Sequence, residues 1–215
     1  IDGCDVSANA VILKATNAGG LAGSTKDGTV TGCTVTINTL TAQNATYAGG
    51  FVGQAENTAF EIVTANIGTF TAEGATAGGF AGFVQNSDVL APEISVSQVT
   101  NAAAFGGLAG KTGESSFENA KVTLDSASAD VVAGGFGSAL LPTVNNAIVY
   151  VNGNLTGQTA AAGFAGSMPS GSISGVLVYI SGAVNAQTDA AGFACTLGGT
   201  VRGCKVYLGQ NSTVT

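Results

Sequence analysis

A short glycine-rich motif recurs seven times along this 215-residue chain at a nearly constant spacing. Each copy places glycine directly before a leucine or phenylalanine, as in the segment Gly19-Gly20-Leu21-Ala22-Gly23. These glycines lie 30, 29, 28, 28, 28 and 29 residues apart, at Gly20, Gly50, Gly79, Gly107, Gly135, Gly163 and Gly192. A fixed period along a whole chain indicates stacked structural repeats rather than an irregular globular core.

Each period predicts extended structure rather than a helix. β-Branched residues dominate, no stretch keeps an apolar period of 3.6 residues, and side chains alternate, so that Val122 and Leu124 share one face. After the glycine motif we expect a polar turn and then a strand, such as Cys33 to Ile37 or Ala120 to Leu124. A weaker extended piece follows, for example around Leu40, and leads through alanine-rich sequence to the next motif.

Three strands and three corners in each period describe one coil of a β-solenoid. We therefore predict an all-β fold with a single domain over residues 1–215, about seven coils, and about 28 residues with three short strands per coil. A partial coil spans residues 1–19, and further coils begin near residues 19, 49, 78, 106, 134, 162 and 191. The paired glycines fit a corner, because a positive φ costs glycine little.

Stacking equivalent positions predicts two internal ladders of apolar side chains. The first contains Leu21, Phe51, Phe80, Leu108, Phe136, Phe164 and Phe193. The second contains Val35, Ile94, Val122, Val149, Val178 and Val206. In the second coil, Phe60 and Ile62 occur a few residues early, and we expect a longer loop there.

The composition excludes several classes of protein. Only 9% of the residues are charged, the net charge is −7, and the single arginine and five lysines form no basic stripe, so we expect no nucleic-acid partner. Collagen does not fit three prolines without a three-residue glycine period, and no apolar run approaches the roughly 18 residues of a membrane span. The chain has no histidine, which removes histidine-based catalytic triads and most zinc sites.

The first glycine motif and the sequence after it resemble a known repeat. Gly19-Gly20-Leu21-Ala22-Gly23, followed by Gly28-Thr29-Val30-Thr31-Gly32-Cys33-Thr34-Val35, resembles the GLUG-type repeat of bacterial surface proteins. The segment from Gly192 to Tyr207 is also similar, whereas the other copies mostly replace leucine by phenylalanine and lose the cysteine. The resemblance implies an extracellular location on a bacterial cell and a role in adhesion or as a stalk. It implies no catalytic residues.

The four cysteines lie at the two ends of the array. Cys4 and Cys33 are 29 residues apart, one period, so they should stack on adjacent coils at a separation that a disulfide accepts. Cys195 and Cys204 are nine residues apart, on what we expect to be consecutive strands. Two disulfides are one interpretation, and four buried free thiols are the other.

Three of the four tyrosines fall at one position in consecutive coils. If Val149, Val178 and Val206 point inward, then Tyr150, Tyr179 and Tyr207 point outward, with two aliphatic neighbours on the same face, Ile148 and Leu177. One interpretation is aromatic stacking that only stabilises the sheet. The other is a contact face, since contiguous exposed apolar surface often marks a binding site.

No group of residues predicts catalysis or a bound cofactor. A glycosidase needs two carboxylates at a defined separation, and the sequence identifies no such pair. Glu93 and Lys121 occupy equivalent positions on neighbouring coils, where a surface ion pair is the simpler interpretation. We therefore expect a protein that is not an enzyme and that has no metal or cofactor.

Two functions remain open. The first is a structural or adhesive extracellular rod, a segment of a cell-surface protein or a protomer of a filament. The second is a carbohydrate-binding or carbohydrate-processing β-helix that uses the tyrosine face. Neither end of the array shows a polar cap, so we expect longer sequence to cover the ends or copies to associate end to end or laterally. A host or cell-surface protein and a glycan are further candidate partners.

Overall fold

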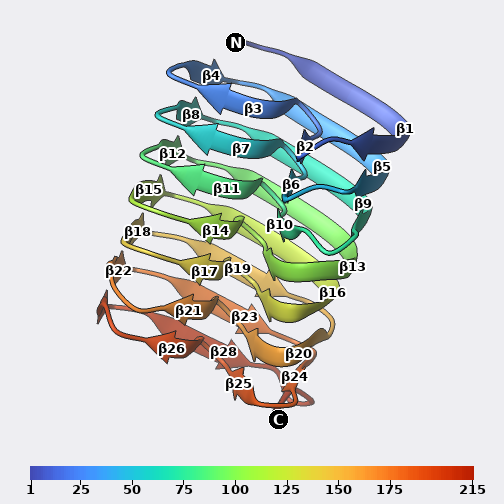
Figure 1. Cartoon of the computed structure of the whole chain (residues 1–215). Helices are drawn as coiled ribbons and strands as arrows, with labels where there is room; N and C mark the ends of the chain where they lie inside the picture. Colours follow the sequence, from blue (N-terminus) through green and yellow to red (C-terminus); the bar gives the residue numbers. More distant parts are fainter.

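The computed structural model describes residues 1–215 as an all-β solenoid without helices. The chain winds through about 7 turns of roughly 29 residues, and every named strand pairing is parallel. Equivalent strands of successive turns lie side by side, so the two termini are at opposite ends of the stack (Figure 1). The predicted fold class is therefore confirmed.

The largest sheet, called here the long sheet, runs the full length of the solenoid. Its main path contains β1 (Asp5–Lys14), β5 (Thr34–Gln43), β9 (Thr64–Ala72), β13 (Glu93–Gly106), β16 (Lys121–Ala133), β19 (Ile148–Val151), β23 (Leu177–Ile180) and β28 (Lys205–Leu208). Shorter strands extend it beside this path: β2 (Asn17–Gly19), β6 (Tyr47–Gly49), β10 (Thr76–Gly78), β20 (Leu155–Ala162), β24 (Ala183–Ala186), β25 (Asp189–Ala191) and β29 (Thr213–Val214).

Two seven-stranded sheets form the other walls. The glycine-motif sheet follows directly on each motif and contains β3 (Ala22–Lys26), β7 (Val52–Glu56), β11 (Ala81–Gln85), β14 (Ala109–Thr112), β17 (Phe136–Ala139), β21 (Ala165–Met168) and β26 (Ala194–Leu197). The short-strand sheet contains β4 (Thr29–Thr31), β8 (Ala59–Glu61), β12 (Asp88–Leu90), β15 (Ser115–Glu118), β18 (Pro142–Asn145), β22 (Ser172–Ser174) and β27 (Thr200–Arg202).

The three strands of a coil are divided differently from the prediction. The segment expected to be a polar turn contains a strand of its own, such as β4 in the first coil. The two later pieces form one strand in the early coils, so that β5 includes Leu40. They separate only toward the C-terminus, where β19 is followed by β20 and β23 by β24.

The predicted ladders form the core. Phe136 is fully buried, and its ring lies 5.6 Å from that of Phe164, which stacks 5.1 Å from that of Phe193. The valine ladder is also confirmed by the register, with Ala65 filling the position left open in the second coil. Residues of both ladders are half-buried only in the terminal coils, because a neighbouring layer is present on one side alone.

The second coil has no longer loop, contrary to the expectation. Phe60 lies in β8, pairs in register with Val30 and Val89, and points into the core. Its ring packs edge-on against Phe80 at 5.0 Å. Ile62 is 61% exposed at a corner with φ 52°. Both residues therefore belong to the short-strand sheet and its corner, which the prediction had not included.

The motif glycines are needed for close packing, and the expected positive φ is absent from them. A Cβ on Gly107 would lie 2.1 Å from the carbonyl oxygen of Gly134 and 2.6 Å from a Val122 methyl group. Any side chain there would force two coils apart. The left-handed residues lie elsewhere. One series occupies the corner between the short-strand sheet and the long sheet: Gly3, Gly32, Ile62, Ala91, Asn119, Asn146, Gly175 and Gly203. A second series occupies the corner between the glycine-motif sheet and the short-strand sheet: Asp27, Asn57, Asn86, Leu141 and Gly171. Asn44, Gly74 and Asn101 lie in the long-sheet part of their coils.

Candidate functional site

The outer face of the long sheet carries a row of stacked tyrosines. Tyr150, Tyr179 and Tyr207 are paired in register on β19, β23 and β28. The rings of Tyr150 and Tyr179 have centroids 5.2 Å apart and planes 14° apart, and those of Tyr179 and Tyr207 are 4.7 Å and 8° apart. The valine directly before each tyrosine points inward, since Val149 and Val178 are buried and Val206 is half-buried. The outward orientation of the tyrosines that alternation predicts is therefore correct.

Two aliphatic side chains extend this row on the same face. Ile148 and Leu177 are half-buried and stand in register with each other, two residues before the tyrosines. These five residues, Ile148, Tyr150, Leu177, Tyr179 and Tyr207, are called here the tyrosine stripe. The next residue in the column of Ile148 and Leu177 is Lys205, which is exposed.

The same face of the sheet is polar on the N-terminal side of the stripe. Lys121, in register with Ile148, donates a hydrogen bond from Nζ to Glu93 Oε1 at 2.6 Å. Both side chains are about half exposed, at 52% and 56%. The hydrogen bond to Glu93, reinforced by the carboxylate charge, raises the pKa of Lys121 above its ordinary value. The face thus changes from charged to aromatic between β16 and β19.

Ring stacking limits what the stripe can bind. Stacked at about 5 Å, each tyrosine ring covers a face of its neighbour. Sugars bind aromatic residues mainly by lying flat on a ring face. Such a face is open at Tyr207, which is 43% exposed and has a neighbouring tyrosine on one side only. At the other end of the stripe, Tyr150 is half-buried and has Thr123 as its in-register neighbour on the side away from Tyr179. The stripe therefore presents a long row of rings for broad contact and one exposed terminal ring face, at Tyr207.

The largest hollow on the surface lies elsewhere and was not predicted. It has a volume of about 630 Å³ and crosses four coils along the short-strand sheet. Its lining is Asn86, Ser87, Asp88, Glu114, Ser115, Ser116, Leu141, Pro142, Thr143, Gly171 and Ser172. These residues come from positions repeated at the coil period, so only their stacking, and no local motif, brings them together.

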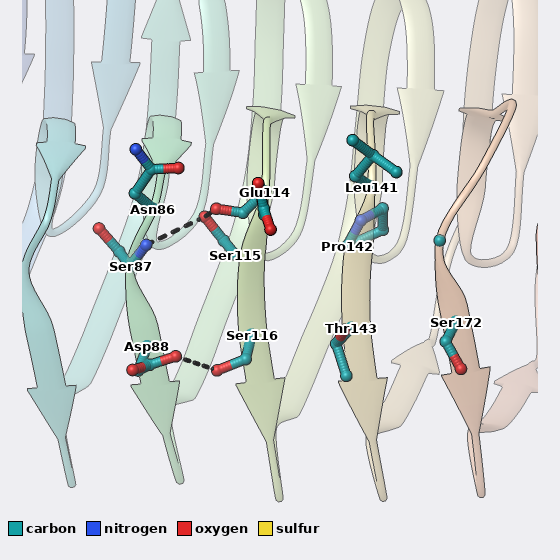
Figure 2. Close-up of a pocket in the computed structure, with 11 residues that line it drawn as sticks. Asn86, Ser87, Asp88, Glu114, Ser115, Ser116, Leu141, Pro142, Thr143 and Ser172 are labelled. Carbon is teal, nitrogen blue, oxygen red and sulfur yellow. Dashed lines mark hydrogen bonds between the residues drawn. The ribbon is translucent and has the colours of Figure 1, made fainter.

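Hydrogen bonds within this hollow join neighbouring strands (Figure 2). Ser116 donates to Asp88 Oδ1, and Ser115 Oγ accepts from the backbone N–H of Ser87 at 3.3 Å. Figure 2 shows Thr143 and Ser172 continuing the row on the next two strands. The lining contains no aromatic or basic side chain. These contacts connect one coil to the next, which is a structural role.

All four cysteines are free thiols in the structure. Cys4 and Cys33 stack as predicted, since the backbone N–H of Cys4 donates to Cys33 Sγ at 3.2 Å. A disulfide between them stays a prediction. Cys195 and Cys204 do not lie on consecutive strands, because β27 separates β26 from β28. That pairing therefore has less geometric support.

The environments of the thiols differ. Cys33 is fully buried, and its thiol lies 3.3 Å from the carbonyl oxygen of Thr31. Burial raises the pKa of the Cys195 thiol, and the negative charge of Asp189 raises it further. Among the described side chains, no group of three or more Cys, Asp or Glu residues has the arrangement of a metal site. The structure also holds no helix long and apolar enough to cross a membrane.

Comparisons with known proteins add no family. No protein-family model matches the chain, and neither a curated protein nor a solved structure matches it. The resemblance to the GLUG-type repeat therefore stays a prediction from the residues that carry it.

Proposed function

We propose that this chain is a non-catalytic structural and adhesive rod on the outside of a bacterial cell. It would act as a segment of a surface protein or as a protomer of a surface filament. Continuous parallel ladders and a close-packed core support the structural part, because they make every coil hold its neighbours in fixed register. The resemblance to the GLUG-type repeat supports the location.

The tyrosine stripe is the observation that carries the adhesive part. Tyrosine supplies large contact area at low entropic cost, and it is enriched in protein interfaces. Here three such rings are held rigid by mutual stacking on a continuous sheet. Because these rings are already ordered in the free chain, binding a partner costs little side-chain entropy on this side of the interface. Cell-surface proteins and further copies of the chain are the proposed partners.

Carbohydrate binding or processing has less support from the same face. Tyr179 has a tyrosine ring on both sides, and half-buried Tyr150 has Tyr179 on one side and Thr123 as its in-register neighbour on the other. The exposed ring at Tyr207 therefore offers the best face for a flat sugar. The hollow on the short-strand sheet offers hydroxyls but no aromatic platform. A glycan array tests this alternative directly, and specific binding that depends on Tyr207 would favour it.

A bead-adhesion assay tests the proposal. Beads coated with the chain are mixed with cells that produce it, and compared with beads that carry the triple variant Tyr150→Ser, Tyr179→Ser and Tyr207→Ser. The matched control, Thr34→Ser, Thr36→Ser and Thr64→Ser, alters the same face of the long sheet at its N-terminal half.

We expect the wild-type and control beads to bind and the stripe variant to lose at least about tenfold in attachment, as expected for loss of several interface aromatics. Circular dichroism confirms that each variant retains its fold. Equal attachment by a folded stripe variant, or no attachment by the wild-type chain, would overturn the adhesive role.

A further inference from the structure

We infer that the stacked tyrosines of the stripe are a site of covalent dityrosine cross-linking between coils. The reaction joins Tyr179 to Tyr150 or to Tyr207 when a one-electron oxidant, a haem peroxidase with hydrogen peroxide, reaches the stripe. The inference rests on the ring geometry and the register of the strands, and it holds whether or not the stripe also binds a partner.

The stacking places the reacting carbons of neighbouring rings close together. Dityrosine forms by a bond between the two ring carbons next to the hydroxyl-bearing carbons, the Cε atoms. The ring centroids of Tyr150 and Tyr179 lie 5.2 Å apart and those of Tyr179 and Tyr207 lie 4.7 Å apart, only slightly farther than in two rings joined by a direct bond. Rotation about χ2, which is a soft torsion in tyrosine, turns the stacked rings edge to edge for this bond.

The step balances between two phenols and one peroxide. The peroxidase removes one electron and one proton from each of two neighbouring tyrosines, and the O–O bond of hydrogen peroxide breaks as the peroxide is reduced to two water molecules. The two phenoxyl radicals combine through one Cε carbon of each ring. Each bonded Cε then loses its hydrogen as a proton, and the phenolic oxygen of the same ring takes up a proton. Two hydroxyls are restored, and the chain loses two hydrogen atoms in total.

The fold holds the reacting rings together before any radical forms. Val149 and Val178, which precede the first two tyrosines, are fully buried, so close packing fixes the register of the strands below the rings. Groups held at contact distance react far faster than separate molecules, because little entropy is lost on reaching the transition state. Tyr207 is 43% exposed and gives the oxidant access, while Tyr179 contacts a tyrosine on each side. Every coupling of stacked neighbours therefore involves Tyr179.

The rest of the chain offers the oxidant few competing sites. There is no tryptophan, and the one methionine, Met168, is fully buried. The fourth tyrosine, Tyr47, has Asn17 and Thr76 as its in-register neighbours, and its ring stacks on Phe83, which carries no hydroxyl. Tyr47 therefore lacks a neighbouring phenol with which to couple. The free thiols are the remaining oxidisable groups, and alkylation blocks those that are accessible.

The cross-link would tie successive coils together by a carbon–carbon bond. Coupling Tyr150 to Tyr179 joins β19 to β23, and coupling Tyr179 to Tyr207 joins β23 to β28. Either bond closes a loop of one coil and restricts the unfolded chain as a disulfide does, so it should raise the thermal midpoint. Unlike a disulfide, it stays intact in a reducing buffer. An oxidant would thus convert the stacked rings into a permanent link between coils.

Peroxidase oxidation of the dilute 215-residue chain, after alkylation of the accessible thiols, tests the inference. The variants are Tyr179→Phe, Tyr150→Phe, Tyr207→Phe and, as the matched control, Tyr47→Phe, each of which keeps its ring and loses one hydroxyl. In Tyr179→Phe the two remaining stripe tyrosines are two strands apart, about 10 Å, so the dityrosine yield should fall at least about tenfold. Each of the other three variants retains a stacked pair and should still form the cross-link.

The blue fluorescence of dityrosine measures the yield, and peptide mapping after reduction locates the bond. We expect oxidised wild-type chain that has lost two hydrogen atoms, contains Tyr179 in the linked peptides, and unfolds several degrees higher than the untreated chain. Equal yields in all four variants would overturn the assignment, and so would cross-links that join only separate chains. No dityrosine in the folded wild-type chain, under conditions that couple free tyrosine, would also overturn it.

Discussion

Lys121 on β16 donates a hydrogen bond to Glu93 on β13 at 2.6 Å, across the boundary between two coils. The two residues are 28 positions apart in the sequence and directly opposite each other in the sheet. This pair shows how the period of the chain produces side-chain contacts, because residues one period apart lie side by side on neighbouring strands.

The first prediction concerns the titration of this pair. The pKa of Lys121 is raised above its ordinary 10.5 by the hydrogen bond and the charge of Glu93. The pair therefore contributes to folding stability in full below pH 10.5, and its contribution disappears as the pH rises through the raised pKa. NMR titration of the Lys121 ammonium should give a value above 10.5 that returns to it in Glu93→Gln. An unchanged value in that variant would show that the hydrogen bond does not persist in solution.

The second prediction compares the inside and outside of the solenoid. Phe136 is fully buried in the phenylalanine ladder, so Phe136→Asp should cost about 4 kcal/mol or more of unfolding free energy, through the lost ring and a buried charge. Lys121→Asp, on the outer face, should cost no more than about 1 kcal/mol. Denaturant unfolding measures both, and similar midpoints would contradict the assignment of inner and outer positions.

The third prediction separates glycines that pack from glycines that do not. Gly107→Ala would push a methyl group to 2.1 Å from the carbonyl oxygen of Gly134, and overpacking of this kind should cost about 3 kcal/mol. Gly28→Ala is the control, because the nearest atom to its new Cβ lies 3.7 Å away. Its thermal midpoint should stay close to that of the wild type. Equal destabilisation by both substitutions would point to a general cost of losing glycine.

The fourth prediction concerns the N-terminal cysteines. If the chain matures in an oxidising compartment, Cys4 and Cys33 should form a disulfide, because they already stack on adjacent coils. Intact mass spectrometry without reduction should then show a loss of about 2 Da that maps to the peptide pair carrying both residues. A mass that corresponds to four free thiols in protein isolated from its natural compartment would exclude this bond.

Much of the architecture could be predicted from the sequence because equivalent residues stack. The period located the coils, and alternation around Val149 and Val178 placed Tyr150 and Tyr179 on the outside. The short-strand sheet was missed because its strands have three or four residues between corners, so β4 and β12 look like parts of turns. Phe60 does not fit the period of the predicted strands for the same reason, since it belongs to β8 of this sheet.

The remaining errors have a common physical origin. The motif glycines looked like corner residues, but their role is a close approach between coils, which depends on distances that a single period does not reveal. The separation of Cys195 from Cys204 by β27 follows from the same missing sheet. The polar hollow joins residues from four coils, and no local pattern marks such a surface.

The tyrosine stripe as contact face is the central functional claim, and tyrosine footprinting tests it most directly. The chain has four tyrosines, and the fourth, Tyr47, stacks on Phe83 at 5.1 Å outside the stripe and serves as an internal control. Iodination is measured by mass spectrometry for the free chain and for the chain bound to the cells that produce it. On binding, Tyr150, Tyr179 and Tyr207 should become protected from iodination, while the reactivity of Tyr47 stays unchanged. Stripe tyrosines that react as fast in the bound chain as in the free chain would contradict the contact role.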